Sequence, residues 1–576
     1  MQHITIFCCF FAYANAFITS IYICQYEYLI DIFAFLMYNK RKRKEGRAVI
    51  KTDIKLPFNY TTEDIYSALT DRLPVSKDEI KDVRLVKRTL NISDKSNIHY
   101  IATVAAEFSA EREAGLLKMK KKVAPMDDLS LDLPPSRFSS RPVVVGAGPA
   151  GLFAALLLAE AGARPILIDR GFPVTEREKK VNAFTSLGLL DPECNIQFGE
   201  GGAGSFSDGK LKVGGMDKYK YKILSDLISF GAPEDILYSV GAHLGTDKLK
   251  NIVQKIRQKI ISLGGEVLFS VKLTSLKIND GRLVGAVCER EGTSFDIDTD
   301  SLILATGHSA RDTFLMLRQA GVSMMAKGFG IGLRIEHPRE YIDRLSYGDN
   351  PPSGIGAASY HLVTHLQGGR SVYSFCMCPG GTVVAAASEQ GGIVTNGMSE
   401  YARNADNSNA AFLVSVTPAD FGSDDALAGI ELQRVIERRA FSLAGGNYKA
   451  PTTTMEAFIG RGRAAISRSL TPSYPIGTTP HSPEEYLPEY VTDSLRSAIP
   501  DFDSWMGGFY YPDAALTGPE TRTTSPVRIL RGSDYSALGI SGLYPAGEGA
   551  GYAGGIISSA RDGLVVAEAL ILARKK

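Results

Sequence analysis

Three glycines carry the clearest chemical signal in this sequence. Gly146, Gly148 and Gly151 stand in "VVVGAGPAGLFAALLLA", between an apolar run and an Ala/Leu-rich run, with GxGxxG spacing. In a strand–turn–helix unit the first glycine permits the tight turn, the second admits a pyrophosphate, and the third lets helix and strand pack closely. The N-terminus of the helix offers free N–H groups and a positive dipole end to the phosphates. The spacing therefore predicts a dinucleotide site.

The residues after the next apolar run fit the same site. Asp169 ends the apolar run "ILID", a position at which its carboxylate can accept hydrogen bonds from ribose hydroxyls, and Arg170 follows it. This motif does not separate FAD from NAD, because both contain an ADP half. Two distant segments favour FAD: "LILATG" at 302–307 and "GLYPAGEGAGYAGG" at 542–555.

Those two segments resemble the second and third signatures of the FAD-binding superfamily that includes glutathione reductase and p-hydroxybenzoate hydroxylase. In that superfamily an acidic residue of the third signature binds the ribityl chain, and the helix after it points its N-terminus at the flavin. Such a dipole favours negative charge on reduced flavin. Glu548 stands at the acidic position, where Asp is commoner. The resemblance implies FAD as the cofactor.

Longer motifs resemble the family of uncharacterised FAD-dependent dehydrogenases. They are "NIQFGEGGAGSFSDGKL" at 195–211, "SFCMCPGG" at 374–381, "ETRTTSPVRI" at 520–529 and "GEGAGYAGGIISSARDG" at 547–563. The likeness runs from about residue 48 to the C-terminus and implies FAD, an α/β fold and oxidoreductase activity. The predicted FAD contacts are Gly146, Gly148, Gly151, Asp169, Arg170, Gly199, Gly201, Gly202, Gly204, Ser205, Asp208, Ala305, Gly307, Gly547, Glu548, Gly554, Gly555 and Ile556.

Few other side chains are obligatory, because a flavin itself carries the hydride or electron step. His308, directly after "LATG", is the candidate acid or base. Cys376 and Cys378 are two apart, so on a strand they share a face, either as a redox pair or as two thiols packed in a core. Arg522 and Arg528 are candidates to bind a carboxylate-bearing substrate or a nicotinamide phosphate, or to form salt bridges. No metal site is expected.

The sequence has no second strand–GxGxxG–helix unit and no CxxxxC pair near the first. This absence favours the hydroxylase and amine-oxidase side of the superfamily, in which any NAD(P)H binds transiently without its own Rossmann unit. We expect a dehydrogenase or reductase acting on an unidentified small molecule. The alternatives are a flavin monooxygenase and a nucleic-acid or partner-binding protein with structural FAD. With 64 basic and 63 acidic residues, the charge balance speaks against nucleic acid.

The elements that must position these residues form an α/β protein with a split Rossmann-like FAD-binding domain, an inserted β-rich substrate domain and a small N-terminal α+β domain. Alternation predicts strands over 48–57 and 99–108, a Thr-capped helix over 61–73 and hairpin strands over 266–290. The last helix carries Ile557, Ala560, Leu564, Ala567 and Leu570 on one stripe. The expected domains are an N-terminal extension (1–46), the α+β domain (47–115), a linker (116–140), the FAD-binding domain (141–319 and 525–576) and the substrate domain (320–524).

The N-terminal extension has three interpretations. Residues 4–26 contain no charged residue and a basic run follows at 40–44, as in a single membrane anchor with the globular part cytoplasmic. Translation starting at Met37 is the second interpretation. A secretory signal fits poorly, since nothing basic precedes the apolar stretch. Membrane contact is expected only through residues 4–36. Seven cysteines, an odd number without a CxxC pair, favour a reducing compartment, and we expect a cytoplasmic protein.

Overall fold

The computed structural model describes residues 49–119, 122–125, 129–134, 137–211 and 215–574. The expected N-terminal anchor or alternative start at Met37 lies outside these residues. Contacts divide the chain into two units. The small unit takes in residues 1–91, 98–128 and 225–240, and the large unit takes in the remainder, 92–97, 129–224 and 241–576.

The small unit is built on an antiparallel sheet with the strand order β2-β3-β1-β4. Buried residues alternate along β1, and Thr61 caps α2 in a reciprocal pair with Asp64, as the sequence predicts. The apolar faces of the strands and helices form a separate core. The elements are β1 (Val49–Pro57), α2 (Thr62–Arg72), β2 (Asp82–Asn91), β3 (His99–Glu107), α3 (Ala110–Leu117) and β4 (Ala124–Pro125).

A distant segment completes this unit. The Arg88 backbone N–H donates to the Tyr238 carbonyl, and the Val240 N–H donates to the Arg88 carbonyl. The Arg88 guanidinium lies over the rings of Tyr60, Tyr100 and Tyr238. Residues 225–240 therefore pack with the small unit, although the sequence interpretation placed them in the FAD-binding domain.

The large unit contains a parallel five-stranded sheet of Rossmann type, with the order β24-β11-β5-β6-β7. Three distant parts of the chain contribute its strands. They are β5 (Val143–Val145), β6 (Ile166–Asp169), β7 (Glu266–Phe269), β11 (Leu302–Leu304) and β24 (Leu543–Pro545).

The predicted hairpin over 266–290 is wrong in its first strand. β7 pairs parallel with β6, and the hairpin is formed by β8 (Lys272–Asn279) and β9 (Arg282–Arg290), which β10 (Thr293–Asp298) extends. Periodicity identifies strands but not their partners, and "EVLF" satisfies either pairing.

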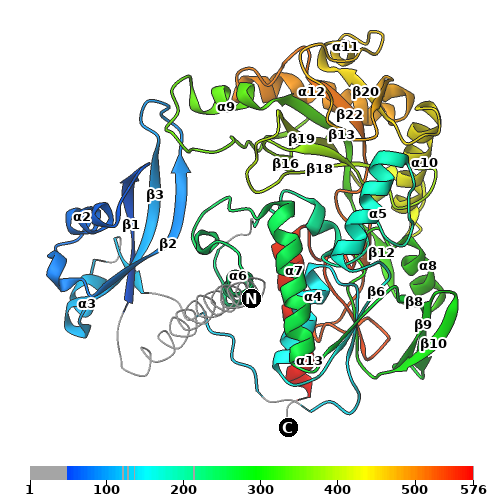
Figure 1. The fold of residues 1–576 in the computed structure, drawn as a ribbon, viewed down its shortest axis with the longest axis horizontal. Helices are drawn as coiled ribbons and strands as arrows, with labels where there is room; N and C mark the ends of the chain where they lie inside the picture. The colour runs from blue at the N-terminus through cyan, green and yellow to red at the C-terminus, as the bar shows by residue number, and fades with distance from the viewer. Residues whose placement is uncertain (1–48, 120–121, 126–128, 135–136, 212–214, 575–576) are drawn as a thin grey trace, which may run out of the picture. The chain divides into compact units, whose positions relative to one another are not determined.

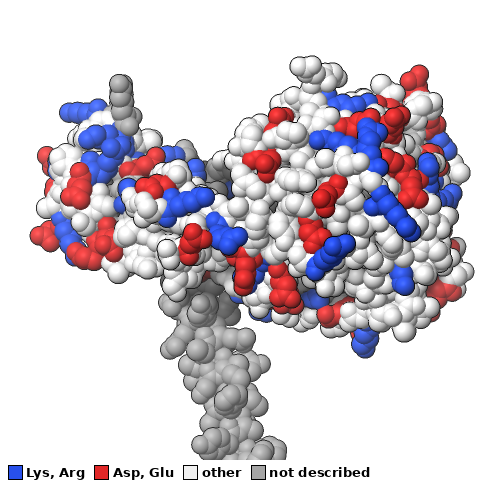
Figure 2. Space-filling model, turned by 90° about the horizontal axis from the view of Figure 1, so that it is seen from above, with Lys and Arg blue, Asp and Glu red and all other residues white. Residues whose placement is uncertain are grey.

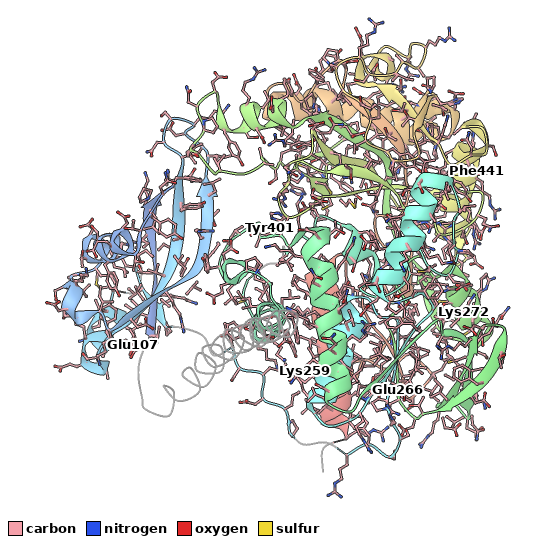
Figure 3. All side chains as sticks on the ribbon, in the orientation of Figure 1. Glu107, Lys259, Glu266, Lys272, Tyr401 and Phe441 are labelled. Carbon is pink, nitrogen blue, oxygen red and sulfur yellow. The ribbon has the colours of Figure 1, made fainter. Side chains whose placement is uncertain are left out.

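Helices α4 (Pro149–Glu160), α7 (Gly245–Ser262) and α13 (Ile556–Ala573) lie side by side (Figure 1). All five residues of the predicted α13 stripe are buried. The packing of α13 on α4 is close: a Cβ at Gly563 would lie 2.1 Å from the Ala150 carbonyl oxygen. In Figure 3, Lys259 and Glu266 mark where the chain leaves α7 and enters β7. Other helices here are α5 (Val174–Leu187), α6 (Lys218–Ser229) and α8 (Arg311–Gln319).

A second, mostly antiparallel sheet of eight strands fills the expected insertion. Its strands are β13 (Phe329–Pro338), β14 (Val363–His365), β15 (Ser371–Tyr373), β16 (Met377–Cys378), β19 (Asn407–Val416), β20 (Ala450–Thr454), β21 (Thr478–Pro480) and β22 (Ala515–Glu520). A hairpin of β17 (Thr382–Ala385) and β18 (Thr395–Met398) and a ribbon of β12 (Met324–Ala326) with β23 (Val527–Ile529) accompany it. The helices are α9 (Arg339–Tyr347), α10 (Ala428–Leu443), α11 (Met455–Ile459) and α12 (Glu489–Trp505).

Charge on the surface is mixed. On the face drawn in Figure 2, basic and acidic side chains are interspersed among the described residues without a continuous basic area. Among the residues that the structure describes, no helix is both long and apolar enough to cross a bilayer.

Candidate functional site

A pocket of about 280 Å³ opens in the large unit at the carboxyl ends of β5, β6, β11 and β24. In open α/β sheets this edge is where ligands bind. The N-terminal residues of α4 and α13 form part of the wall, and residues from the antiparallel part of the unit complete it. The latter are Phe375, Cys376, Asn396, Gly397, Arg522 and Thr523.

The three fingerprint glycines have different roles in the geometry. Gly146 has φ +103°, and a Cβ there would lie 2.4 Å from the Ala305 carbonyl oxygen. A Cβ at Gly151 would lie 1.8 Å from the Gly146 oxygen, so this glycine permits the close packing of strand and helix. At Gly148 the nearest atom to a Cβ, the Cα of Gly202, is 3.7 Å away. The missing side chain at Gly148 therefore leaves space in the pocket and not for protein packing, and this space is what the predicted pyrophosphate site needs.

Asp169 and Arg170 both line the pocket. The Asp169 carboxylate accepts the Ala147 N–H at 2.7 Å and the Gly171 N–H at 2.8 Å, so it also fixes the glycine turn. The Arg170 guanidinium pairs with Glu193 and Asp312 and lies over the Phe198 ring. The role of the Asp169 carboxylate in binding the ribose stays a prediction.

Arg177 on α5 supports the site from behind the pocket wall, and the sequence analysis missed it. It is fully buried, and its guanidinium donates to the carbonyls of Asn195, Ile196, Gly199 and Glu200. These bonds shape the loop that carries Gly202 and Gly204 to the pocket wall. No sequence signal identifies it, because an arginine on an amphipathic helix is ordinarily exposed.

Some of the FAD contacts predicted in the glycine-rich loop, residues 199–208, lie behind the pocket wall. Gly199, Gly201 and Ser205 do not line the pocket, whereas Asp208 does. A Cβ at Gly199 would lie 2.6 Å from the Arg177 side chain, and one at Gly201 would lie 1.9 Å from the Ser205 hydroxyl. These residues shape the loop.

The second and third signatures line the same pocket as the fingerprint glycines. Its lining includes Ala305, Gly307, Glu548, Gly554, Gly555 and Ile556, whereas Gly547 packs on Ala150. Burial raises the pKa of Glu548 to about 7, and the nearby Lys327 ammonium opposes that effect. Gly555 caps α13 with φ +126°, and because Gly555 and Ile556 line the pocket, the free N–H groups of the helix N-terminus lie at its wall.

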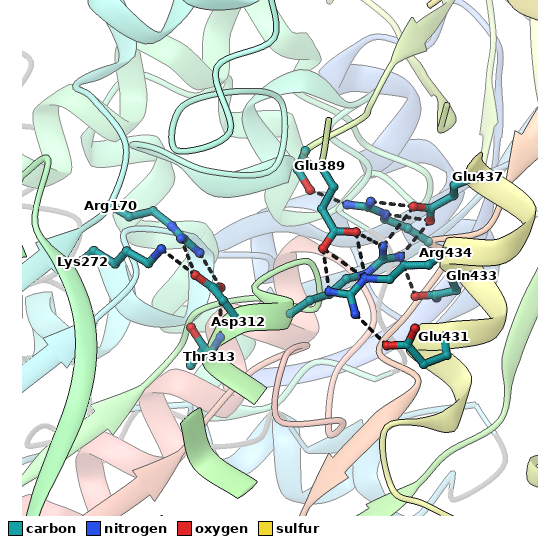
Figure 4. A network of polar contacts seen from close by, with 12 residues as sticks. Arg170, Lys272, Asp312, Thr313, Glu389, Glu431, Gln433, Arg434 and Glu437 are labelled. Atoms are coloured by element: carbon teal, nitrogen blue, oxygen red, sulfur yellow. Dashed lines mark hydrogen bonds and ion pairs between the residues drawn. The ribbon is translucent and has the colours of Figure 1, made fainter. Parts of the chain in front are cut away.

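His308 and Arg522 both line the pocket. Burial and the adjacent guanidinium groups of Arg522 and Arg311 lower the pKa of His308 to about 3, so its imidazole is neutral. Arg522 is bound to the buried Glu437 carboxylate at 2.8 Å, which is the salt-bridge alternative. Figure 4 shows this network, in which Glu437 accepts hydrogen bonds from Arg311 of α8 and Glu389 accepts one from Arg434 of α10.

The structure separates the remaining candidates. Cys376 lines the pocket, and Cys378 is buried beneath the wall. Cys378 lies in β16, and Cys376 directly precedes that strand. Arg528 lies outside the lining, where it donates to the Gly551 carbonyl and covers the Tyr552 ring. Lys210, which belongs to the glycine-loop motif at 195–211, lines the wall, and Asn396 and Thr523 line it without having been predicted as site residues. No group of metal-binding side chains occurs in the described part of the chain.

These features define a dinucleotide site of the FAD type. The open position at Gly148, the free helix N-terminus beside it and the convergence of the other two signatures on the same pocket fit a bound FAD, which these residues would hold. Two family models agree: "FAD binding domain" matches residues 140–181, and "FAD-dependent protein, C-terminal domain-like" matches residues 328–523.

A full-length relative places the chain in its family. A Clostridium beijerinckii protein, described only as an uncharacterised protein, is 43% identical over 530 residues, which cover 91% of this chain and 98% of that protein. The chain belongs to this family of FAD-dependent proteins.

Solved structures show only distant likeness. A flavin-dependent brominase mutant matches with TM-score 0.35 and 11% identity, covering 76% of this chain and 81% of its own. A 3-ketosteroid dehydrogenase from Rhodococcus jostii matches with TM-score 0.32 and 13% identity, covering 77% and 100%. Such values support no inference about this chain.

Proposed function

We propose that this protein is an FAD-dependent oxidoreductase that acts as a dehydrogenase or reductase on a small molecule. One observation carries the proposal: a single pocket joins the fingerprint glycines to polar side chains of the antiparallel part, His308, Cys376, Asn396 and Arg522 among them. A substrate seated against these side chains would face the flavin. Bound FAD supplies two-electron transfer, and the chain orients the substrate beside it.

His308 has a defined part in this proposal. Its neutral imidazole, next to the Ser309 hydroxyl, can accept a hydrogen bond from a substrate or donate one to it. NAD(P)H is the proposed transient electron donor. A monooxygenase is the competing enzyme class, and it differs by coupling oxygen consumption to hydroxylation.

The test is an anaerobic visible spectrum of the purified protein before and after NADPH, and separately NADH. Loss of the flavin absorbance supports a nicotinamide-linked reductase. Flavin that stays oxidised with both donors contradicts the nicotinamide link and directs the search to an organic reductant. Protein that binds no flavin contradicts the proposed function itself.

A further inference from the structure

Two cysteines beside the flavin pocket differ in environment from the other described thiols. Cys376 lines the pocket and Cys378 lies under it, 1% exposed. Burial raises the pKa of the Cys194 and Cys288 thiols to about 11, as expected of sulfur packed in a core. The pKa of Cys376 is lowered instead, chiefly by its interaction with the Cys378 thiol.

Cationic groups converge on this pair. The Arg334 guanidinium, fully buried, places Nη2 3.7 Å from the Cys378 sulfur and donates through Nη1 to the Cys376 carbonyl at 3.0 Å. Its charge is balanced by Glu520, 3.2 Å away.

Lys210 adds a second positive charge. Its ammonium group donates to the carbonyl of Met377, the residue between the two cysteines. Asp208 lies 3.9 Å from this ammonium but is already paired with Arg403 through contacts of 2.9 and 2.5 Å. The Lys210 charge lowers the pKa of the Cys376 thiol and thereby favours the thiolate, the form in which cysteine reacts.

We propose that Cys376 and Cys378 are a redox-active pair that exchanges two electrons with the bound FAD, an inference that rests on the proposed function. The Cys376 thiolate and the Cys378 thiol lose two electrons and one proton as the S–S bond forms. Oxidised flavin takes both electrons and the proton and becomes the reduced anion. The reverse reaction reduces the disulfide.

The test counts electrons in full-length holoprotein oxidised with diamide and titrated anaerobically with dithionite. Wild-type protein and the control variant Cys288→Ala should take four electrons per FAD, two for the flavin and two for the disulfide. Cys376→Ser and Cys378→Ser should take two. Uptake of two electrons by flavin-loaded wild-type protein overturns the inference and leaves the proposed function intact.

A second measurement needs no variant. The wild-type peptide that contains both cysteines is treated with N-ethylmaleimide after diamide, and again after reduction, and is weighed by mass spectrometry. No alkylation after diamide and two additions after reduction are expected. Two additions after diamide overturn the inference. Protein without FAD contradicts the proposed function and removes the electron partner, which the flavin spectrum reveals independently.

Discussion

A side chain added at Gly148 would enter the pocket without displacing protein atoms, because the nearest neighbour of its Cβ is 3.7 Å away. Gly148→Asp should therefore fold but lose FAD, since its carboxylate would meet the pyrophosphate with like charge. We expect at least a tenfold fall in the flavin-to-protein absorbance ratio, with an unchanged circular dichroism spectrum. Gly148→Asn, which has the size of the Asp variant but no charge, is the matched control. Full flavin content in the Asp variant would contradict the assignment.

Glu548 makes stability depend on pH. A carboxyl whose pKa rises from about 4.3 when unfolded to about 7 when folded contributes most below pH 4.3 and loses that contribution as pH rises through 7. For FAD-free protein the loss from this group is roughly 4 kcal/mol. Chemical unfolding between pH 5 and 8 should show a shallower pH dependence for Glu548→Gln. Parallel curves for the two proteins would refute the expectation.

The sequence predicts residues whose identity is dictated by local backbone geometry. The glycines at 146, 148 and 151 and the acid at 169 occupy fixed places in one strand–turn–helix unit, so spacing alone locates them. Arg177 and Lys210 reach the site through bonds to carbonyls of other segments. Such contacts depend on how elements meet in space, which single-sequence periodicity does not encode.

Among the elements, α13 and α4 pack closely at Gly563. Gly563→Ala would place a methyl group 2.1 Å from the Ala150 carbonyl oxygen. Overpacking of this kind costs about 1–3 kcal/mol. Urea unfolding followed by flavin fluorescence should show the loss. Gly507→Ala, where a Cβ has no neighbour within 4 Å, is the control and should leave the curve unchanged.

Elements with an uninterrupted local pattern were predictable and the pairing of short strands was not. The α13 stripe and the capped α2 follow from helical periodicity and one Thr. The four residues of β7 fit either an antiparallel hairpin, as the sequence predicts, or a parallel pairing. The position of β6 beside them decides for the parallel pairing.

At the scale of the whole molecule, the two units have separate cores. Leu56, fully buried in the small unit, can therefore be truncated without disturbing the flavin site. Leu56→Ala should cost about 2–5 kcal/mol in the small unit alone. Calorimetry should show one transition shifted downward, while flavin release occurs at the wild-type temperature. Leu304→Ala, in the parallel sheet, should shift flavin release instead.

The hydrogen bonds from Arg177 to four carbonyls should affect the rate at which FAD binds. A loop that is ordered before FAD binds loses little further conformational entropy on binding. More of the contact energy therefore appears as affinity. Rebinding of FAD to stripped protein should then follow a single exponential phase whose rate rises linearly with FAD concentration. Arg177→Met would release the loop and introduce a slow step independent of that concentration.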